Sequence, residues 1–321
     1  MIDIDTKRTV RRTTNFYFSH FSKPQRTVRP TIYAITPTYR RAVQKAELTR
    51  LSNTFRLVPH FHWIVVEDSN LRTELVSRFL ARSGLQHTHL HVPTPRRYKR
   101  PGMPRATEQR NAALGWLRTH RSSKDTGVVF FADDDNTYSV ELFDEMRLTR
   151  RVSVWPVGLV GGRRYERPLV DKGRVVGWYT GWKANRPFPI DMAGFAVNLQ
   201  VALSNPRALF KRLGSKPGMQ ESDFLKQITR VEDLEPKAAN CTRVSLAVDP
   251  LSSRPALLSP SPCAFTASSL ADVTATTPLA YALTAAVIIY RHDNQVLVWH
   301  TRTEKVNLGN ERWKDSVQIE V

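Results

Sequence analysis

The sequence predicts an α/β fold built around a sheet of mainly parallel strands. From residue 31 onward, short apolar runs rich in β-branched residues alternate with helical patterns. The run at 128–132 is strongly apolar, as expected of a buried strand. Polar or aromatic residues follow three of these runs directly, and in open α/β sheets ligands bind beyond the carboxyl ends of the strands.

The elements are expected in the following order along the chain. Helical periodicity at Val43, Ala46, Leu51 and Phe55 predicts the first helix. We expect strands at 31–36, 61–66, 88–92 and 128–132, and helices at 41–55, 71–83 and 105–120. After residue 140 the pattern loosens into β-rich, aromatic segments at 152–160 and 174–182. This change suggests a second half built for a different ligand.

Composition bounds the class of protein. The 321 residues are 41% hydrophobic, enough for a sizeable core, and the formal charge of +19 indicates an anionic partner. Two cysteines exclude a disulfide framework and a four-cysteine zinc site. A basic nucleic-acid-binding protein is one alternative, but apart from the run at 96–100 the positive residues are dispersed, and no RNA- or DNA-binding motif is found.

Four segments can be distinguished. Residues 1–30 form a stem-like N-terminal segment without an apolar, signal-peptide-like stretch, and residues 31–139 form the half expected to bind a nucleotide. Residues 140–243 together with 296–321 form the second half. Residues 244–295 are poor in charge and rich in Ser, Pro, Ala and Leu, which predicts a disordered insert. We hypothesise that this insert is a translated intron.

Asp133, Asp134 and Asp135 directly follow the buried run at 128–132. Three adjacent carboxylates repel one another, so a hard divalent cation with oxygen ligands, Mn²⁺ or Mg²⁺, is a natural occupant. Such ions take few protein carboxylates and complete their shell with phosphates and water, which predicts a metal-bridged diphosphate. The alternative is that these aspartates cap a helix beginning near Ser139.

Arg105 and Arg110 stand at the start of the predicted helix 105–120. Helix N-termini favour anions, and the arginine guanidinium binds phosphate and carboxylate groups through two parallel hydrogen bonds. The spacing alone is equally consistent with two solvated surface arginines.

Seven motifs in matching order resemble the animal β-1,3-glucuronyltransferases, which have the GT-A glycosyltransferase fold, a Rossmann-like nucleotide-binding half fused to an acceptor-binding half. The motifs are Pro37-Thr38-Tyr39, Val66-Glu67-Asp68, Glu108-Gln109-Arg110-Asn111, the run at 131–138, the run at 187–196, Leu234-Glu235-Pro236 and the run at 299–305. The runs at 163–168 and 218–223 are most similar to the brain-type branch of the family.

The resemblance implies inverting transfer of glucuronic acid from UDP-glucuronate to the 3-hydroxyl of a terminal β-galactose, with Mn²⁺ held by Asp135 and with Glu221 as the catalytic base. It implies donor-binding roles for Pro37, Thr38, Tyr39, Asp68, Arg105, Arg110, Asp133, Asp134, Asp135, His300, Thr301 and Arg302. It implies acceptor-binding roles for Glu166, Trp182, Arg186, Asp191 and Asn310. By pattern alone, Glu166 and Glu221 could be surface carboxylates and His300 a structural histidine.

The resemblance also bears on partners and location. It implies a homodimer, with Asn310 reaching the neighbour's acceptor site, and a Golgi membrane location with a lumenal catalytic part, where Asn240 of Asn240-Cys241-Thr242 would be glycosylated. The acceptor stays open between N-acetyllactosamine and the Gal-Gal-Xyl linker of proteoglycans. A relative whose catalysis is impaired by the insert is a further alternative.

Overall fold

The computed structural model describes residues 29–41, 43–100, 102–216, 218–241 and 298–300. The predicted insert, and the predicted stem apart from residues 29 and 30, therefore lie outside the described residues. In chain order the elements are β1 Thr31–Thr38, α1 Gln44–Phe55, β2 Phe61–Glu67, α2 Glu74–Ser83, β3 His87–His91, η1 Arg96–Tyr98, α3 Thr107–His120, β4 Gly127–Phe131, β5 Asn136–Tyr138, α4 Val140–Arg147, β6 Val152–Val154, β7 Val157–Gly158, β8 Tyr165–Asp171, β9 Arg174–Tyr179, η2 Met192–Gly194, β10 Phe195–Asn198, α5 Leu199–Ser204, α6 Gln220–Leu225, η3 Val231–Asp233, β11 Glu235–Pro236, α7 Ala238–Cys241 and β12 Val298–His300.

One large sheet runs through both halves of the described chain. It has seven strands in the order β11-β6-β10-β4-β1-β2-β3. The strands β4, β1, β2 and β3 are mutually parallel, which confirms the prediction of a mainly parallel sheet in this half. β10 is antiparallel to both β4 and β6, so the second half continues the same sheet in a mixed arrangement.

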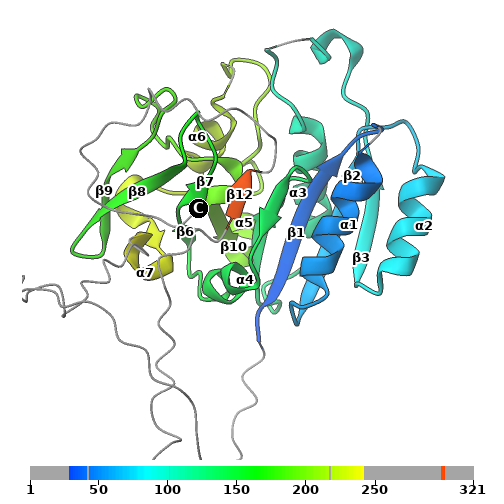
Figure 1. The fold of residues 1–321 in the computed structure, drawn as a ribbon, viewed down its shortest axis with the longest axis horizontal. Helices are drawn as coiled ribbons and strands as arrows, with labels where there is room; N and C mark the ends of the chain where they lie inside the picture. The colour runs from blue at the N-terminus through cyan, green and yellow to red at the C-terminus, as the bar shows by residue number, and fades with distance from the viewer. Residues whose placement is uncertain (1–28, 42, 101, 217, 242–297, 301–321) are drawn as a thin grey trace, which may run out of the picture.

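Helices cover both faces of this sheet (Figure 1). Alternate strand residues point to opposite sides. Ile32, Trp63 and Phe130 pack with α1, α2 and α4 in one buried cluster. Ile35, Ile64 and Phe131 pack with α3 and α5 in the other. The result is a three-layer α/β/α arrangement, as the α/β prediction requires.

The predicted strands and helices are present, with shifted ends. The first helix begins at Gln44 instead of at residue 41, and α2 begins at Glu74 instead of at residue 71. Thr73 is the N-cap of α2 and its hydroxyl accepts from the Val76 N–H at 3.5 Å. A hydroxyl that binds a free N–H fixes a helix start more firmly than apolar periodicity does.

A second sheet of five strands, in the order β5-β12-β7-β8-β9, lies beside the first. The β-rich segment 152–160 divides between the two sheets, with β6 in one and β7 in the other. Pro156, between them, has no N–H to donate to a ladder. β12 pairs antiparallel with β5, which places the His300 backbone opposite Asn136. Among the described residues, no helix combines the length and the apolar character that a membrane span requires.

Candidate active site

The carboxyl ends of three parallel strands meet at one edge of the large sheet. The register pairs Thr38 of β1 with Glu67 of β2, and Ile35 of β1 with Phe131 of β4. The residues that follow these strands, Tyr39, Asp68 and Asp133, are therefore neighbours at this edge. The prediction that the sheet collects these polar ends on one side is confirmed.

Tyr39 and Asp68 occupy the outer part of this edge. The Tyr39 side chain is 51% exposed, and the Arg41 guanidinium lies 4.5 Å from its ring centroid. The Asp68 carboxylate accepts from the Thr94 N–H at 2.7 Å and lies 3.1 Å from Lys99 Nζ. An open aromatic face beside a fixed carboxylate suits a planar, N–H-bearing ring. Pro37 and Thr38 are buried within β1 beneath it.

The aspartate cluster is held by arginines. Arg110 Nη2 donates to both carboxylate oxygens of Asp133 at 2.7 Å, and Arg41 Nη2 lies 2.8 Å from Asp134 Oδ1. The Arg50 guanidinium also donates to the Asp134 carbonyl at 2.9 Å. Arg110 is buried, so the alternative of a solvated surface arginine is wrong for this residue, whereas Arg105 is exposed.

The helix-cap alternative for these aspartates is wrong. α4 begins at Val140 with Ser139 as its N-cap, and β5 separates it from the aspartates. Burial raises the pKa of Asp133, and Arg110 opposes that effect while Asp135 adds to it. Burial also raises the pKa of Asp134 to about 6, against the pull of Arg41.

This donor set fits a divalent cation held by few protein atoms. Among the described residues, no three His, Cys, Asp or Glu side chains are grouped so that they alone could hold a metal. Asp133 and Asp134 bind arginines, and Asp135 is a half-buried carboxylate directly beside them. A hard cation bound this way would take its other ligands from substrate phosphates and water. His300 is next to this position through its backbone pairing with Asn136, whereas Thr301, Arg302 and Asn310 lie outside the described residues.

Glu221 lies on the opposite wall, in the first turn of α6. Ser222, fully buried, ties this helix to Phe188: its Oγ donates to the Phe188 carbonyl at 2.8 Å and accepts from the Phe188 N–H at 3.2 Å. The Thr107 hydroxyl of α3 donates to Gln220 Oε1 at 3.0 Å. α6 is therefore fixed against both halves of the molecule.

The Glu221 carboxylate is nearly enclosed, with its side chain 15% exposed. Its Oε2 accepts no hydrogen bond from the described residues and lies 3.8 Å from Arg186 Nη1. Burial, and secondly the Asp191 charge, raise its pKa to about 7. A carboxylate of this kind is a candidate general base near neutral pH, and the surface-carboxylate alternative is wrong for it.

The other predicted acceptor residues surround Glu221. Trp182 is 38% exposed, with the Arg186 guanidinium 4.7 Å from its ring centroid. Glu166 is buried and accepts from Thr180 Oγ1 at 2.6 Å and from the Gly181 N–H at 2.8 Å, so it is not a surface carboxylate and it holds the turn after β9. Asp191 is the N-cap of η2, and its charge raises the pKa of Asp133, Glu166 and Glu221.

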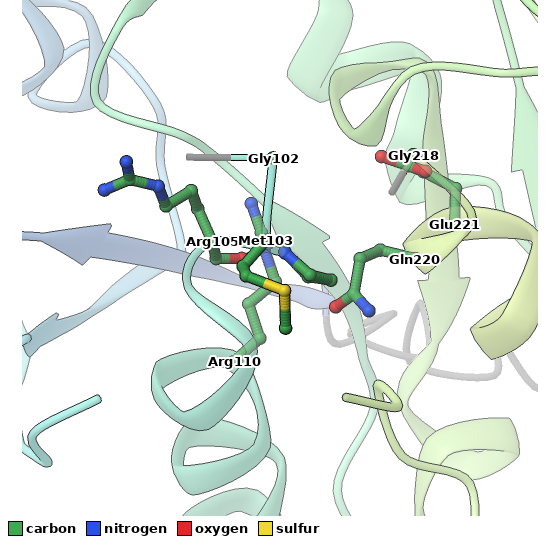
Figure 2. A pocket seen from close by; sticks show the side chains of 8 residues that line it. Gly102, Met103, Arg105, Arg110, Gly218, Gln220 and Glu221 are labelled. Atoms are coloured by element: carbon green, nitrogen blue, oxygen red, sulfur yellow. The ribbon is translucent and has the colours of Figure 1, made fainter. Parts of the chain in front are cut away.

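A cavity of about 300 Å³ joins the two walls (Figure 2). Glu221, Gln220 and Gly218 face Arg110, Arg105 and Met103 across it, and Gly102 and Pro104 complete the lining. Because Arg110 also holds Asp133, the aspartate edge and Glu221 belong to one site. The sequence prediction missed Met103, Gln220 and Arg41. Arg41 directly follows the Pro37 to Arg40 run, and Gln220 directly precedes Glu221, so adjacency was the available signal.

Comparison with known proteins gives the family. The model of Glycosyltransferase family 43 matches residues 51–247, more than half of the chain. Galactosylgalactosylxylosylprotein 3-beta-glucuronosyltransferase 2 of Homo sapiens is 63% identical over 296 residues, which cover 91% of this chain and 76% of that protein. Galactosylgalactosylxylosylprotein 3-beta-glucuronosyltransferase 1 of Homo sapiens is 59% identical over 224 residues, 67% of each chain.

Among solved structures, S. aureus TarS 1-349 is similar over 64% of this chain and 57% of its own, with a TM-score of 0.40 and 16% sequence identity. The mixed sheet between helical layers, together with the family match, agrees with the expected GT-A glycosyltransferase fold. The chain is an enzyme that belongs to glycosyltransferase family 43 and to its 3-beta-glucuronosyltransferase group.

Proposed function

We propose that this protein transfers glucuronic acid from UDP-glucuronate to the 3-hydroxyl of a β-linked galactose, with Mn²⁺ as the cation and inversion at the anomeric carbon. The observation that carries the proposal is the cavity that Glu221 shares with Arg110, the arginine that binds Asp133. A base on one wall and an anion-binding edge on the other are what a displacement at a sugar carbon needs.

The donor would lie along the aspartate edge. Tyr39 offers a ring face to the uracil, and Asp68 can accept from its N–H. Arg105 is exposed, lines the cavity and precedes α3, and its guanidinium suits the donor's phosphates or carboxylate. A divalent cation at Asp135 would neutralise charge on the departing diphosphate.

The acceptor would lie against Trp182, with its reacting hydroxyl at Glu221. The exposed indole offers an apolar face to a sugar ring. The Glu221 carboxylate takes the proton from the 3-hydroxyl while that oxygen bonds to the anomeric carbon and the bond to UDP breaks. A pKa of about 7 keeps a large share of Glu221 ionised at neutral pH while leaving it basic enough to accept the proton.

Two further features extend the proposal to the protein in the cell. Asn240 is exposed, which suits glycosylation in the Golgi lumen. A homodimer with Asn310 near the neighbour's acceptor site completes the expectation from the family. Glycosylation of Asn240 is tested by enzymatic deglycosylation of protein made in secretory cells. The wild-type protein should lose mass, and the Asn240→Gln variant should not. Sedimentation at several concentrations tests the homodimer.

Release of UDP from UDP-glucuronate tests the proposed reaction. We expect release to require Mn²⁺ and to rise with Galβ1-4GlcNAc or with Galβ1-3Galβ1-4Xyl, and the better of the two identifies the acceptor. Asp135→Asn should raise the Mn²⁺ concentration needed for half-maximal release by about 10-fold or more. Asp144→Asn, at an exposed surface pair with Arg29, is the control. No stimulation by metal or by either acceptor would remove the proposal.

A further inference from the structure

We infer that Gly218 is a positioning residue for the acceptor, because the absence of a side chain there sets where the Trp182 ring lies beside Glu221. This inference rests on the proposed function, since it names what holds the surface on which the acceptor sugar would lie. Gly218 lies three positions before Glu221 in the chain, and both line the cavity (Figure 2).

The Trp182 ring occupies the space that a side chain at 218 would need. A Cβ built on Gly218 would overlap Cη2, Cζ3 and Cζ2 of the indole. The six-membered edge of the ring therefore rests directly on the Gly218 backbone. Gly218 also has φ +75°, a conformation that residues with side chains rarely adopt. The ring cannot stay where it is if residue 218 carries even a methyl group.

Arg186 connects this contact to the base. Its Nη1 donates to the Gly218 carbonyl at 3.1 Å and lies 3.8 Å from Glu221 Oε2. The same guanidinium lies 4.7 Å from the Trp182 ring centroid. Gly218, Trp182, Arg186 and Glu221 thus form one contiguous unit. A displacement of the Trp182 indole therefore also disturbs Arg186, the cation beside Glu221.

A side chain at 218 should therefore affect the acceptor and the chemical step, and should spare the donor. On the donor side, Arg110 binds Asp133 and Arg41 binds Asp134, and neither of these ion pairs involves Trp182. Small misplacements of a positioning surface lower rates on the order of 10- to 100-fold. We expect Gly218→Ala to raise the acceptor KM and lower kcat by a combined factor in that range, with the donor KM unchanged within about twofold.

Gly214 provides a matched control. It has φ +74°, almost the same conformation, but a Cβ there meets nothing within 4 Å. Gly214→Ala thus carries the same backbone strain without the overlap. We expect its acceptor and donor parameters to match those of the wild type. Equal effects of Gly214→Ala and Gly218→Ala would overturn the inference, because strain alone would then explain both.

A double-mutant cycle with Trp182→Ala isolates the overlap. Once the indole is removed, Gly218→Ala should have little further effect on acceptor kinetics, so the two changes should be strongly non-additive. An undiminished effect of Gly218→Ala in the Trp182→Ala background contradicts the inference. If Gly218→Ala does not fold alone, the double variant should fold, and failure of both while Gly214→Ala folds would also overturn it.

A readout independent of catalysis separates this inference from the proposed function. Acrylamide quenches tryptophan fluorescence, and the contribution of Trp182 is the difference between a protein with Trp182 and the same protein with Trp182→Phe. This contribution should differ from the wild-type value in Gly218→Ala and should equal it in Gly214→Ala. If no galactose acceptor is used by the wild type, the proposed function fails, yet this quenching still decides whether Gly218 sets the position of the ring. Unchanged quenching in Gly218→Ala would contradict the inference.

Discussion

The environment of Glu221 differs from that of an ordinary glutamate on the protein surface. It is nearly enclosed, its Oε2 accepts no hydrogen bond from the described residues, and its nearest cation is Arg186 at 3.8 Å. Burial, and secondly the Asp191 charge, favour the protonated form, which is why its pKa rises to about 7. Such an arrangement costs stability and is typical of a group kept for proton transfer.

Replacing this carboxylate should stop the chemistry without weakening the donor site. We expect Glu221→Gln to lower kcat by about 10²- to 10⁴-fold, the contribution typical of a general base. Donor affinity, measured by calorimetry, should stay within about twofold because the amide keeps the shape of the side chain. Glu232→Gln, at a carboxylate that is 66% exposed, serves as the control. A Glu221→Gln enzyme with normal turnover would exclude the assigned role.

The same shift makes stability depend on pH. The folded pKa of about 7 exceeds the ordinary 4.5, so the unfolded chain loses this proton first as pH rises. The stability that protonated Glu221 contributes is complete below about pH 4.5 and is lost by about pH 7. Glu221→Gln should therefore match the wild type at pH 4.5 and exceed it at pH 8 by about 2–3 kcal/mol.

Urea unfolding at the two pH values measures this difference. The activity should show the complementary trend, with kcat/KM for the acceptor rising through about pH 7 as the base ionises. A stability difference that is the same at both pH values would mean that Glu221 titrates normally.

At the scale of elements, the function depends on how α6 is fixed. Ser222 binds both the N–H and the carbonyl of Phe188 from a fully buried position. Ser222→Ala leaves both backbone groups without that partner, which should cost about 1–3 kcal/mol in unfolding free energy. Since α6 carries Glu221, kcat should fall more than the donor KM rises.

Ser204→Ala, at an exposed hydroxyl at the end of α5, is the matched control for this measurement. If Ser222→Ala lowers stability but leaves kcat at the wild-type value, the hydrogen bonds between Ser222 and Phe188 support the fold without positioning Glu221.

The sequence predicts these elements unevenly. The apolar runs that form β1, β2 and β4 are clearly predicted as strands, because strands buried in a parallel sheet contain few polar residues. The aspartates after β4 could be placed at the sheet edge for the same reason. Helix starts are less predictable: Thr73 fixes α2 through a side-chain hydrogen bond that periodicity does not reveal.

The pairing of the site residues could not be predicted from the sequence. Arg110 and Asp133 are separated by 23 positions, and Arg186 and Glu221 meet through the packing of α6 on Phe188. Such contacts depend on tertiary structure, so Arg41 was missed and Arg110 was expected only as a ligand for the donor. The roles of His300, Thr301, Arg302 and Asn310 stay predictions.

At the scale of the whole molecule, one sheet joins the half that carries the aspartates to the second half. β4, which precedes the aspartates, and β10 of the second half are hydrogen-bonded neighbours in this sheet. β12 joins β5 directly after the aspartates, although the two strands are far apart in the chain. Chain segments from both sides of residues 244–295 therefore lie beside the aspartates.

Deletion of residues 244–295 should preserve the enzyme. Joining residue 243 to residue 296 leaves Val298–His300 available to pair with β5 and β7. We expect the shortened protein to unfold at the same or a higher temperature, because a shorter connection loses less entropy on closing. Its donor KM should equal or fall below that of the full chain. Loss of donor binding on deletion would show that these residues take part in the site.

The linkage and anomeric configuration of the product test the central claim most directly. The claim is that a base at Glu221 and a donor held at Asp133 to Asp135 act on opposite sides of one sugar carbon. Nuclear magnetic resonance of the product from UDP-glucuronate and a β-galactoside should show glucuronic acid β-linked to O3 of galactose. An α-linked product, another linkage position, or the same product from Glu221→Gln at the wild-type rate would contradict the account.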